Sequence, residues 1–188
     1  MHPSANIAAR PLEALRRFAR AQRGATAVEF AFIATPFLLL LFGILELGLI
    51  FLVSTTLEHA TQEASRKIRT GEFQSSGAVS SDDFETAICD DLAWIGSGCK
   101  AQLNVNTRAY TTIAQMAAGV IDPTKPDCFE SGGPGSVMFV KATIQWKIFT
   151  PLLRPAMAKD SSGNYAIQAT TAFRNEPFPG ETPADACP

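Results

Sequence analysis

A single carboxylate, that of Glu29, lies at the entrance of a long apolar stretch, six residues after Arg23 and directly before Phe30. Burying a carboxylate without a partner is energetically costly, and an ordinary membrane anchor has no use for an acid at this position. A glycine, Gly24, stands five positions before Glu29. Glu29 and Gly24 are therefore the first candidate functional residues.

The sequence carries no catalytic signature beside these residues. Its two histidines, His2 and His59, each lack a second histidine at metal-ligand spacing. No Gly-x-Ser-x-Gly elbow occurs, and the SGGPGS stretch lacks the Gly-Lys-Ser/Thr of a phosphate loop. Asp90 and Asp91 would point to different faces of a helix, which favours a solvated surface over a shared proton. We therefore expect a non-enzymatic protein with no catalytic residue, no metal site and no cofactor.

Residues 30–53 form a 24-residue apolar stretch whose one charged residue is Glu46. It contains 17 residues of Leu, Ile, Phe or Val. Together they favour membrane insertion by about 8 kcal/mol, whereas a central acid costs roughly 3 kcal/mol. The stretch therefore predicts one transmembrane helix. Glu46 lies about 26 Å beyond Glu29 along such a helix, near the outer boundary. It would be either a functional intramembrane acid or an interfacial acid facing water.

Charge is distributed unevenly along the chain. Residues 1–23 hold five arginines and one glutamate, a balance of +4, whereas the remaining residues hold 11 basic and 17 acidic side chains, a balance of −6. By the positive-inside rule the arginine-rich end stays in the cytoplasm and the long C-terminal part is exported. The exported part is acidic and has no basic surface with interleaved aromatic residues, which argues against a nucleic-acid partner.

Four cysteines, Cys89, Cys99, Cys128 and Cys187, lie in the part that is expected to be exported. An even number in an oxidising compartment predicts two disulfides with three possible connectivities, whereas a reducing compartment would leave four free thiols. We expect the local pairing of Cys89 with Cys99, which would tie a helix end to the next segment. Cys128 would then pair with Cys187 and pin the C-terminal tail.

Three interpretations compete for the N-terminal region. A cleaved secretory signal peptide needs an apolar stretch of about 7–15 residues, and this stretch is far longer. A plain signal anchor fits the hydropathy but explains neither Glu29 nor Gly24. Processing on the cytoplasmic side of the apolar stretch, between Gly24 and Ala25, accounts for both residues.

The stretch RGATAVEFAFIATPFLLLLFGILELG resembles the N-terminus of the TadE-like family of pseudopilins. These proteins serve the tight-adherence (Flp) pilus assembly machinery, a branch of the type IVb pilin group. In that family a prepilin peptidase of the inner membrane cuts after a glycine, and a glutamate followed by an aromatic residue lies at the fifth mature position. By this resemblance Gly24 precedes the cut, Ala25 is the new N-terminus, Glu29 is the fifth residue and Phe30 is the aromatic residue.

The resemblance implies a role for Glu29 and extends weakly to the C-terminal part. Cleavage would give Ala25 a free ammonium group, which the Glu29 carboxylate of a neighbouring subunit could meet in a filament. Such a pair repays its desolvation only when its geometry is good, so it would check the register of subunit entry. The alternative is that Glu29 extends to the interface and pairs with Arg23. Residues 174–178, Arg-Asn-Glu-Pro-Phe, also resemble a stretch near the end of family members.

The expected fold is α+β, in which a long N-terminal transmembrane helix continues into a small antiparallel-sheet periplasmic domain, as in pilin-like proteins. An apolar stripe extends this helix over roughly 26–69, with Gly71 as its stop. A second helix is expected to begin at Asp82, with Glu85 completing a capping box. Alternating apolar and polar residues predict three strands, over 102–110, 136–150 and 165–174.

The chain is thus predicted to comprise a basic cytoplasmic leader (1–24), a transmembrane and juxtamembrane helix (25–70) and a periplasmic domain with disulfides (71–188). The resemblance implies a minor pilin-like subunit for assembly of a tight-adherence pilus. Its partners would be the prepilin peptidase, other pilin-like subunits, the pilus assembly platform and the inner membrane. It would cross the bacterial inner membrane once and join the pilus after processing. The alternative is an uncleaved, signal-anchored periplasmic module that binds a partner or acts as a scaffold in the cell envelope.

Overall fold

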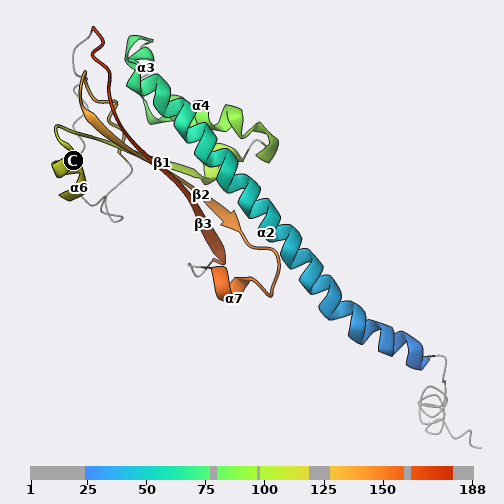
Figure 1. The fold of residues 1–188 in the computed structure, drawn as a ribbon. Coiled ribbons are helices and arrows are strands. Elements are labelled where there is room, and N and C mark those ends of the chain that lie inside the picture. The colour runs from blue at the N-terminus through green and yellow to red at the C-terminus, as the bar shows by residue number, and fades with distance from the viewer. Residues whose placement is uncertain (1–23, 77–79, 97, 119–127, 159–161, 180–188) are drawn as a thin grey trace, which may run out of the picture. The chain divides into compact units, whose positions relative to one another are not determined.

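The structure is a computed structural model that describes residues 24–76, 80–96, 98–118, 128–158 and 162–179. Except for Gly24, the predicted leader therefore lies outside the described residues. The chain divides into two compact units, Met1–Ile44 and Leu45–Pro188, and the division falls inside the long helix α2 (Figure 1). Residues 45–69, which the sequence pattern assigned to the helical segment, thus belong to the same compact unit as the sheet.

Helix α2, Ala25–Arg69, is 45 residues long, in agreement with the helix predicted over 26–69. Leucine and alanine, which favour helices, are frequent along it, and Pro36 is accommodated within it. The hydroxyl of Thr35 donates to the Ala31 carbonyl at 2.7 Å, which satisfies a polar group inside the apolar stretch. By length and composition α2 is a helix that could cross a membrane.

The first unit exposes its apolar side chains. Phe30, Phe32 and Ile33 are 73%, 77% and 73% exposed. The leucines and phenylalanines over residues 37–42 are also exposed, by 37% to 63%. Contiguous exposed apolar surface of this kind indicates contact with lipid or with other helices. The fold is thus α+β with one candidate membrane span.

The second unit contains one antiparallel sheet of three strands in the order β1–β2–β3. The strands are β1 (Leu103–Tyr110), β2 (Val137–Lys147) and β3 (Asn164–Arg174), so all three predicted strands are present with ends shifted by up to three residues. Leu103 pairs with Ile144 and Tyr110 with Val137, which places the end of β1 and the end of β2 at opposite ends of the sheet. Short helices α6 (Ile113–Ala118) and α7 (Arg154–Met157) follow β1 and β2 respectively.

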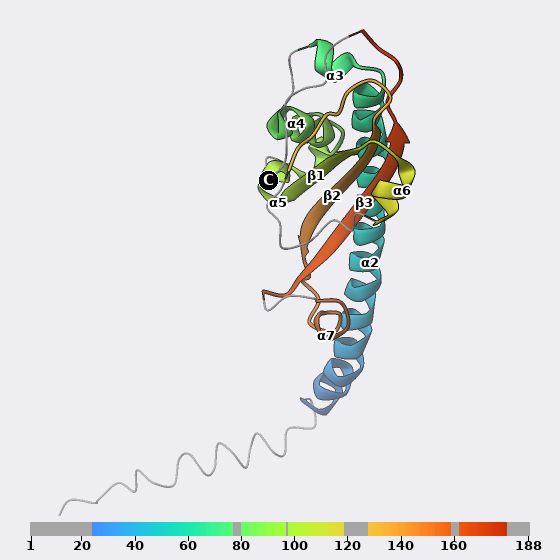
Figure 2. The same ribbon diagram turned by 90° about the vertical axis from the view of Figure 1, so that its left-hand side faces the viewer.

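The core of this unit lies between the sheet and the part of α2 that belongs to it. Figures 1 and 2 both show the three strands beside this part of α2. The apolar stripe of α2, formed by Leu57, Ala60, Ala64 and Ile68, is fully buried, and Val53 extends it by one turn. Alternate residues of the strands fill the other side of the core: Leu103, Val105, Met138, Val140, Ala142, Ile144, Ile167 and Ala169.

Helix α2 ends where backbone geometry requires glycine. Its last turn carries Arg66, Lys67 and Arg69, which favour a helix C-terminus, and Gly71 follows with φ +80°. A Cβ atom at Gly71 would also lie 2.5 Å from the Phe178 ring. Gly71 is therefore required both by its left-handed conformation and by the close approach of the C-terminal segment. The short helix α3 (Glu72–Ser75) begins directly after it.

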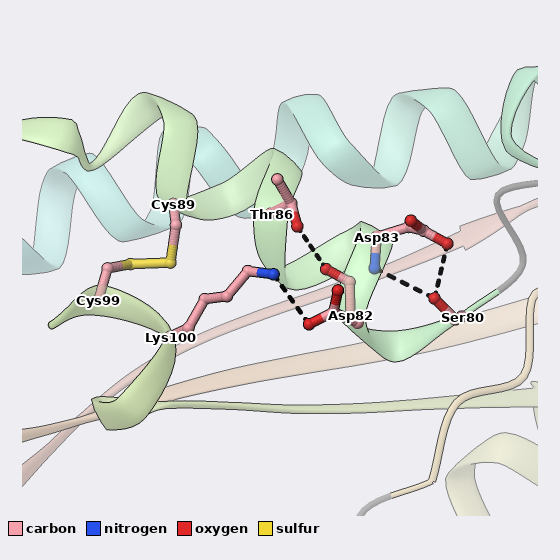
Figure 3. Close-up of polar contacts among 7 residues, drawn as sticks. All are labelled: Ser80, Asp82, Asp83, Thr86, Cys89, Cys99 and Lys100. Atoms are coloured by element: carbon pink, nitrogen blue, oxygen red, sulfur yellow. Dashed lines mark hydrogen bonds and ion pairs between the residues drawn. A yellow bond between two sulfur atoms is a disulfide. The ribbon is translucent and has the colours of Figure 1, made fainter. Parts of the chain in front are cut away.

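Helix α4, Ser81–Asp91, covers the core with Phe84 and Ile88. Its predicted start at Asp82 was wrong: the N-cap is Ser80, whose hydroxyl oxygen accepts the Asp83 backbone N–H at 3.2 Å (Figure 3). Serine and aspartate both cap helices well, and here the serine lies where the chain is still extended, with φ −112° and ψ 156°. Glu85 is therefore not the capping-box partner.

A disulfide joins Cys89 of α4 to Cys99, the first residue of helix α5 (Cys99–Gln102) (Figure 3). Between them lies a short 3-10 helix, η3 (Ala93–Ile95). The bridge closes a loop with a sequence separation of 10, which contributes about 2–3 kcal/mol in the chain-entropy model. Cys128 is also disulfide-bonded. Cys187, its expected partner, lies outside the described residues.

Candidate functional site

The predicted processing position coincides with the start of a helix. Gly24 directly precedes Ala25, the first residue of α2. A Cβ atom at Gly24 would meet nothing within 4 Å, and its φ is not positive. Among the residues that the structure describes, neither packing nor backbone conformation therefore requires a glycine here. This separates Gly24 from Gly71, which the fold itself demands.

The side chains of Glu29 and Phe30 lie in the first turns of α2. Both are exposed, and within the described residues Glu29 makes no hydrogen bond or ion pair. Arg23, the alternative partner considered for Glu29, lies outside those residues. An acid in an apolar helix that has no partner among the described residues is a candidate for pairing with a group on another chain.

The comparison with protein families identifies this segment. The model described as TadE-like protein matches residues 24–66. The N-terminal segment is TadE-like. Comparisons with the curated proteins and with the solved structures gave no match.

The TadE-like segment begins at Gly24 and covers most of α2. The family indicates involvement in tight-adherence pilus assembly, in the company of other pilin-like proteins. The matched residues end before the sheet, so the Arg-Asn-Glu-Pro-Phe stretch at 174–178 is not part of the match. The contacts of this stretch indicate its role.

Residues 174–178 fasten the end of the sheet to neighbouring segments of the second unit. The Asn175 amide donates to the carbonyls of Ser131 and Gly133 at 3.2 and 3.1 Å, and this side chain is only 3% exposed. The Glu176 N–H donates to the Arg69 carbonyl at 2.9 Å, which satisfies an orphan acceptor at the end of α2. This stretch is therefore a structural clasp.

The acid of the apolar stretch, Glu46, has partners that sequence reasoning missed. It lies in the second unit and is only 5% exposed, so it does not face water as one of the two expectations held. Its two carboxylate oxygens accept the backbone N–H groups of Phe149 at 2.6 Å and of Thr150 at 2.8 Å. Glu46 therefore fixes the segment after β2 against α2. No local pattern indicates this, because the partners lie 103 and 104 positions away.

Among the described residues, no group of three or more His, Cys, Asp or Glu side chains could hold a metal ion. The expectation of a protein without catalytic residues or cofactor stays a prediction. The candidate functional site is therefore the exposed start of α2, formed by Gly24, Ala25, Glu29 and Phe30.

Proposed function

We propose that this chain is a minor pilin-like subunit for assembly of a tight-adherence Flp or type IVb pilus, processed by a prepilin peptidase after Gly24. The observation that carries the proposal is the coincidence of two boundaries, because the TadE-like match begins at Gly24 and α2 begins at Ala25. The exposed carboxylate of Glu29 follows one helical turn later.

The glycine supports cleavage because no contact among the described residues requires it. Its Cβ position is empty and its backbone conformation is open to any residue. A peptidase that has to reach the peptide bond after residue 24 would account for a glycine at this position. The prepilin peptidase is the partner that this proposal names.

The exposure of Glu29 supports a role between subunits. After cleavage the Ala25 ammonium of one subunit and the Glu29 carboxylate of another would pair at the membrane boundary. In low dielectric an unpaired member of such a pair is penalised by about 3–5 kcal/mol, so misplaced subunits would be rejected. Exposed apolar side chains around Glu29 provide the surface for packing α2 against neighbouring helices.

The charge distribution and the disulfide support export of the second unit. The +4 balance of residues 1–23 holds the N-terminus in the cytoplasm, and the Cys89–Cys99 bridge fits an oxidising periplasm. The protein would thus cross the inner membrane once and present its sheet to other pilin-like subunits and the assembly platform.

N-terminal sequencing of the protein from membranes, with and without an active prepilin peptidase, tests the proposal. We expect a start at Ala25 only when the peptidase is active. A start at Met1 in both cases would overturn the proposal and would leave an uncleaved, signal-anchored module of the cell envelope.

A further inference from the structure

The segment that follows β2, residues 148–153, presents two large apolar side chains to the outside. Phe149 is 66% exposed and Leu152 is 60% exposed, whereas Ile148 and Thr150 are buried. Single exposed apolar residues are ordinary on protein surfaces. Here, however, Phe149 and Leu152 lie three positions apart in one segment, residues 148–153, which we call the β2–α7 loop.

The β2–α7 loop is held firmly in this arrangement. Glu46 accepts the N–H groups of Phe149 and Thr150 at 2.6 and 2.8 Å. The Arg154 side chain donates to the Ile148 carbonyl at 3.1 Å, and the Leu153 N–H donates to the Thr150 carbonyl at 3.1 Å. The outward direction of Phe149 and Leu152 is therefore set by bonded backbone rather than by a loose connection.

Glu46 also sets the depth of the loop relative to a membrane. It lies in the C-terminal third of the apolar stretch 30–53, whose 24 residues suffice to cross a hydrocarbon core of about 30 Å. By the positive-inside rule this end of the stretch is the outer one, and the loop bonded to Glu46 lies at its level. Leu49 of α2, which is 46% exposed, lines the same hollow as Phe149, so apolar surface continues from the helix to the loop.

The surroundings of the loop have the composition of a lipid interface. A hollow of about 660 Å³ beside it is lined by Leu49, Trp94, Trp146 and Phe149, among others. Tryptophan is the side chain that most favours the headgroup level of a bilayer. Two exposed cations, Lys147 and Arg154, flank the loop, where they could reach lipid phosphates while the apolar side chains enter the acyl region.

We infer that the β2–α7 loop docks the second unit on the outer surface of the same membrane that α2 crosses, with Phe149 and Leu152 inserted among the lipids. The inference rests on α2 spanning the membrane, which is part of the proposed function. In this arrangement the hydrogen bonds of Glu46 connect the end of the membrane span to the lipid-facing loop.

Photo-crosslinking tests this inference in the full chain, reconstituted in vesicles of phosphatidylethanolamine and phosphatidylglycerol. Benzoylphenylalanine would replace one residue at a time: Phe149, Ile113 or Leu40. Ile113 is a matched control, because it is 68% exposed but follows β1 at the opposite end of the sheet. Leu40, 58% exposed within the span, reports insertion of α2 itself.

We expect phospholipid adducts, detected by mass spectrometry, at position 149 in a yield approaching that at position 40, and none above background at position 113. Adducts at 40 but not at 149 would overturn the loop inference and leave membrane insertion intact. Adducts from 149 to another protein chain in place of lipid would also overturn it, and so would equal lipid yields at 149 and 113. Absence of lipid adducts at position 40 as well as at position 149 would instead contradict membrane insertion, and with it the proposed function.

Discussion

The Glu46 carboxylate accepts the backbone N–H of Thr150 at 2.8 Å, although the two residues lie 104 positions apart in the chain. Together with the bond from Phe149, this contact satisfies an acid that the apolar stretch would otherwise leave unpaired. Hydrogen bonds to a charged group contribute about 1.5–3 kcal/mol each, more than bonds between neutral groups. The end of the apolar stretch is thereby coupled to folding of the sheet-containing unit.

Replacing Glu46 tests this coupling. Glu46→Ala leaves two backbone donors without an acceptor, so we expect the free energy of unfolding of the second unit to fall by about 2–4 kcal/mol. Glu46→Gln keeps one amide oxygen and should cost about half as much. Urea unfolding of the detergent-solubilised chain, followed by tryptophan fluorescence, measures both. Glu58→Ala, an exposed acid on the same helix, is the control and should change stability by less than about 0.5 kcal/mol. Equal losses of unfolding free energy in Glu46→Ala and Glu58→Ala would show that the Glu46 hydrogen bonds do not stabilise the second unit.

Gly24→Ala is expected to block processing without affecting the fold. An added methyl group at the cleaved bond displaces the substrate in the peptidase and should slow cleavage by about 10²-fold, whereas no described residue has an atom within 4 Å of the new Cβ atom. The ratio of precursor to mature protein on immunoblots measures the effect. Gly43→Ala is the matched control, because a Cβ atom there also meets nothing within 4 Å. Normal processing of the Gly24 variant, or loss of processing in both, would be evidence against recognition of Gly24.

Glu29→Gln is expected to separate processing from assembly. The amide keeps the size of the side chain but removes the charge that would neutralise a neighbouring ammonium, so cleavage after Gly24 should continue while assembly fails. The number of pili on the cells and the amount of subunit in membranes report the two steps. Glu58→Gln, which changes an exposed acid elsewhere on α2, should leave both unchanged. Wild-type piliation with Glu29→Gln would remove the register role.

Asn175 is expected to be the key residue of the clasp. Its buried amide donates to two carbonyls, of Ser131 and Gly133, so Asn175→Ala should lower the free energy of unfolding by about 1–3 kcal/mol. Asn175→Asp should cost more, since a carboxylate has no proton to donate and would face two carbonyl oxygens. The same urea unfolding measures both variants. Gln168→Ala, at an exposed position of β3, is the control. The clasp would be refuted if Asn175→Asp were as stable as Gln168→Ala.

The long helix α2, helix α4 and the three strands could be predicted because each has a local pattern. Leu57, Ala60, Ala64 and Ile68 recur at helical spacing, and all four are buried against the sheet. The strands alternate with a period of two, and their predicted inward residues fill the core. Such patterns can be recognised in the sequence because the residues on one buried face of a helix or strand recur at a fixed, short spacing.

The start of α4 shows the limit of this approach. Ser80 and Asp82 are both good caps, and sequence alone favoured the aspartate with a glutamate three residues later. The structure selects Ser80, because the chain turns into the helix two residues earlier and Phe84 has to reach the core. Competing caps of similar strength are decided by which helix face must be buried.

The sequence by itself determined the apolar span, its basic flank, the glycine and glutamate at its entrance, and the order of helix and strands. Only the tertiary structure decided what Glu46 and Asn175 do. Their partners are backbone groups, which carry no side-chain signature, and the Glu46 partners lie more than a hundred positions away. Hydrogen bonds to backbone are chosen by the path of the folded chain, and that path is set only when the sheet has packed against α2.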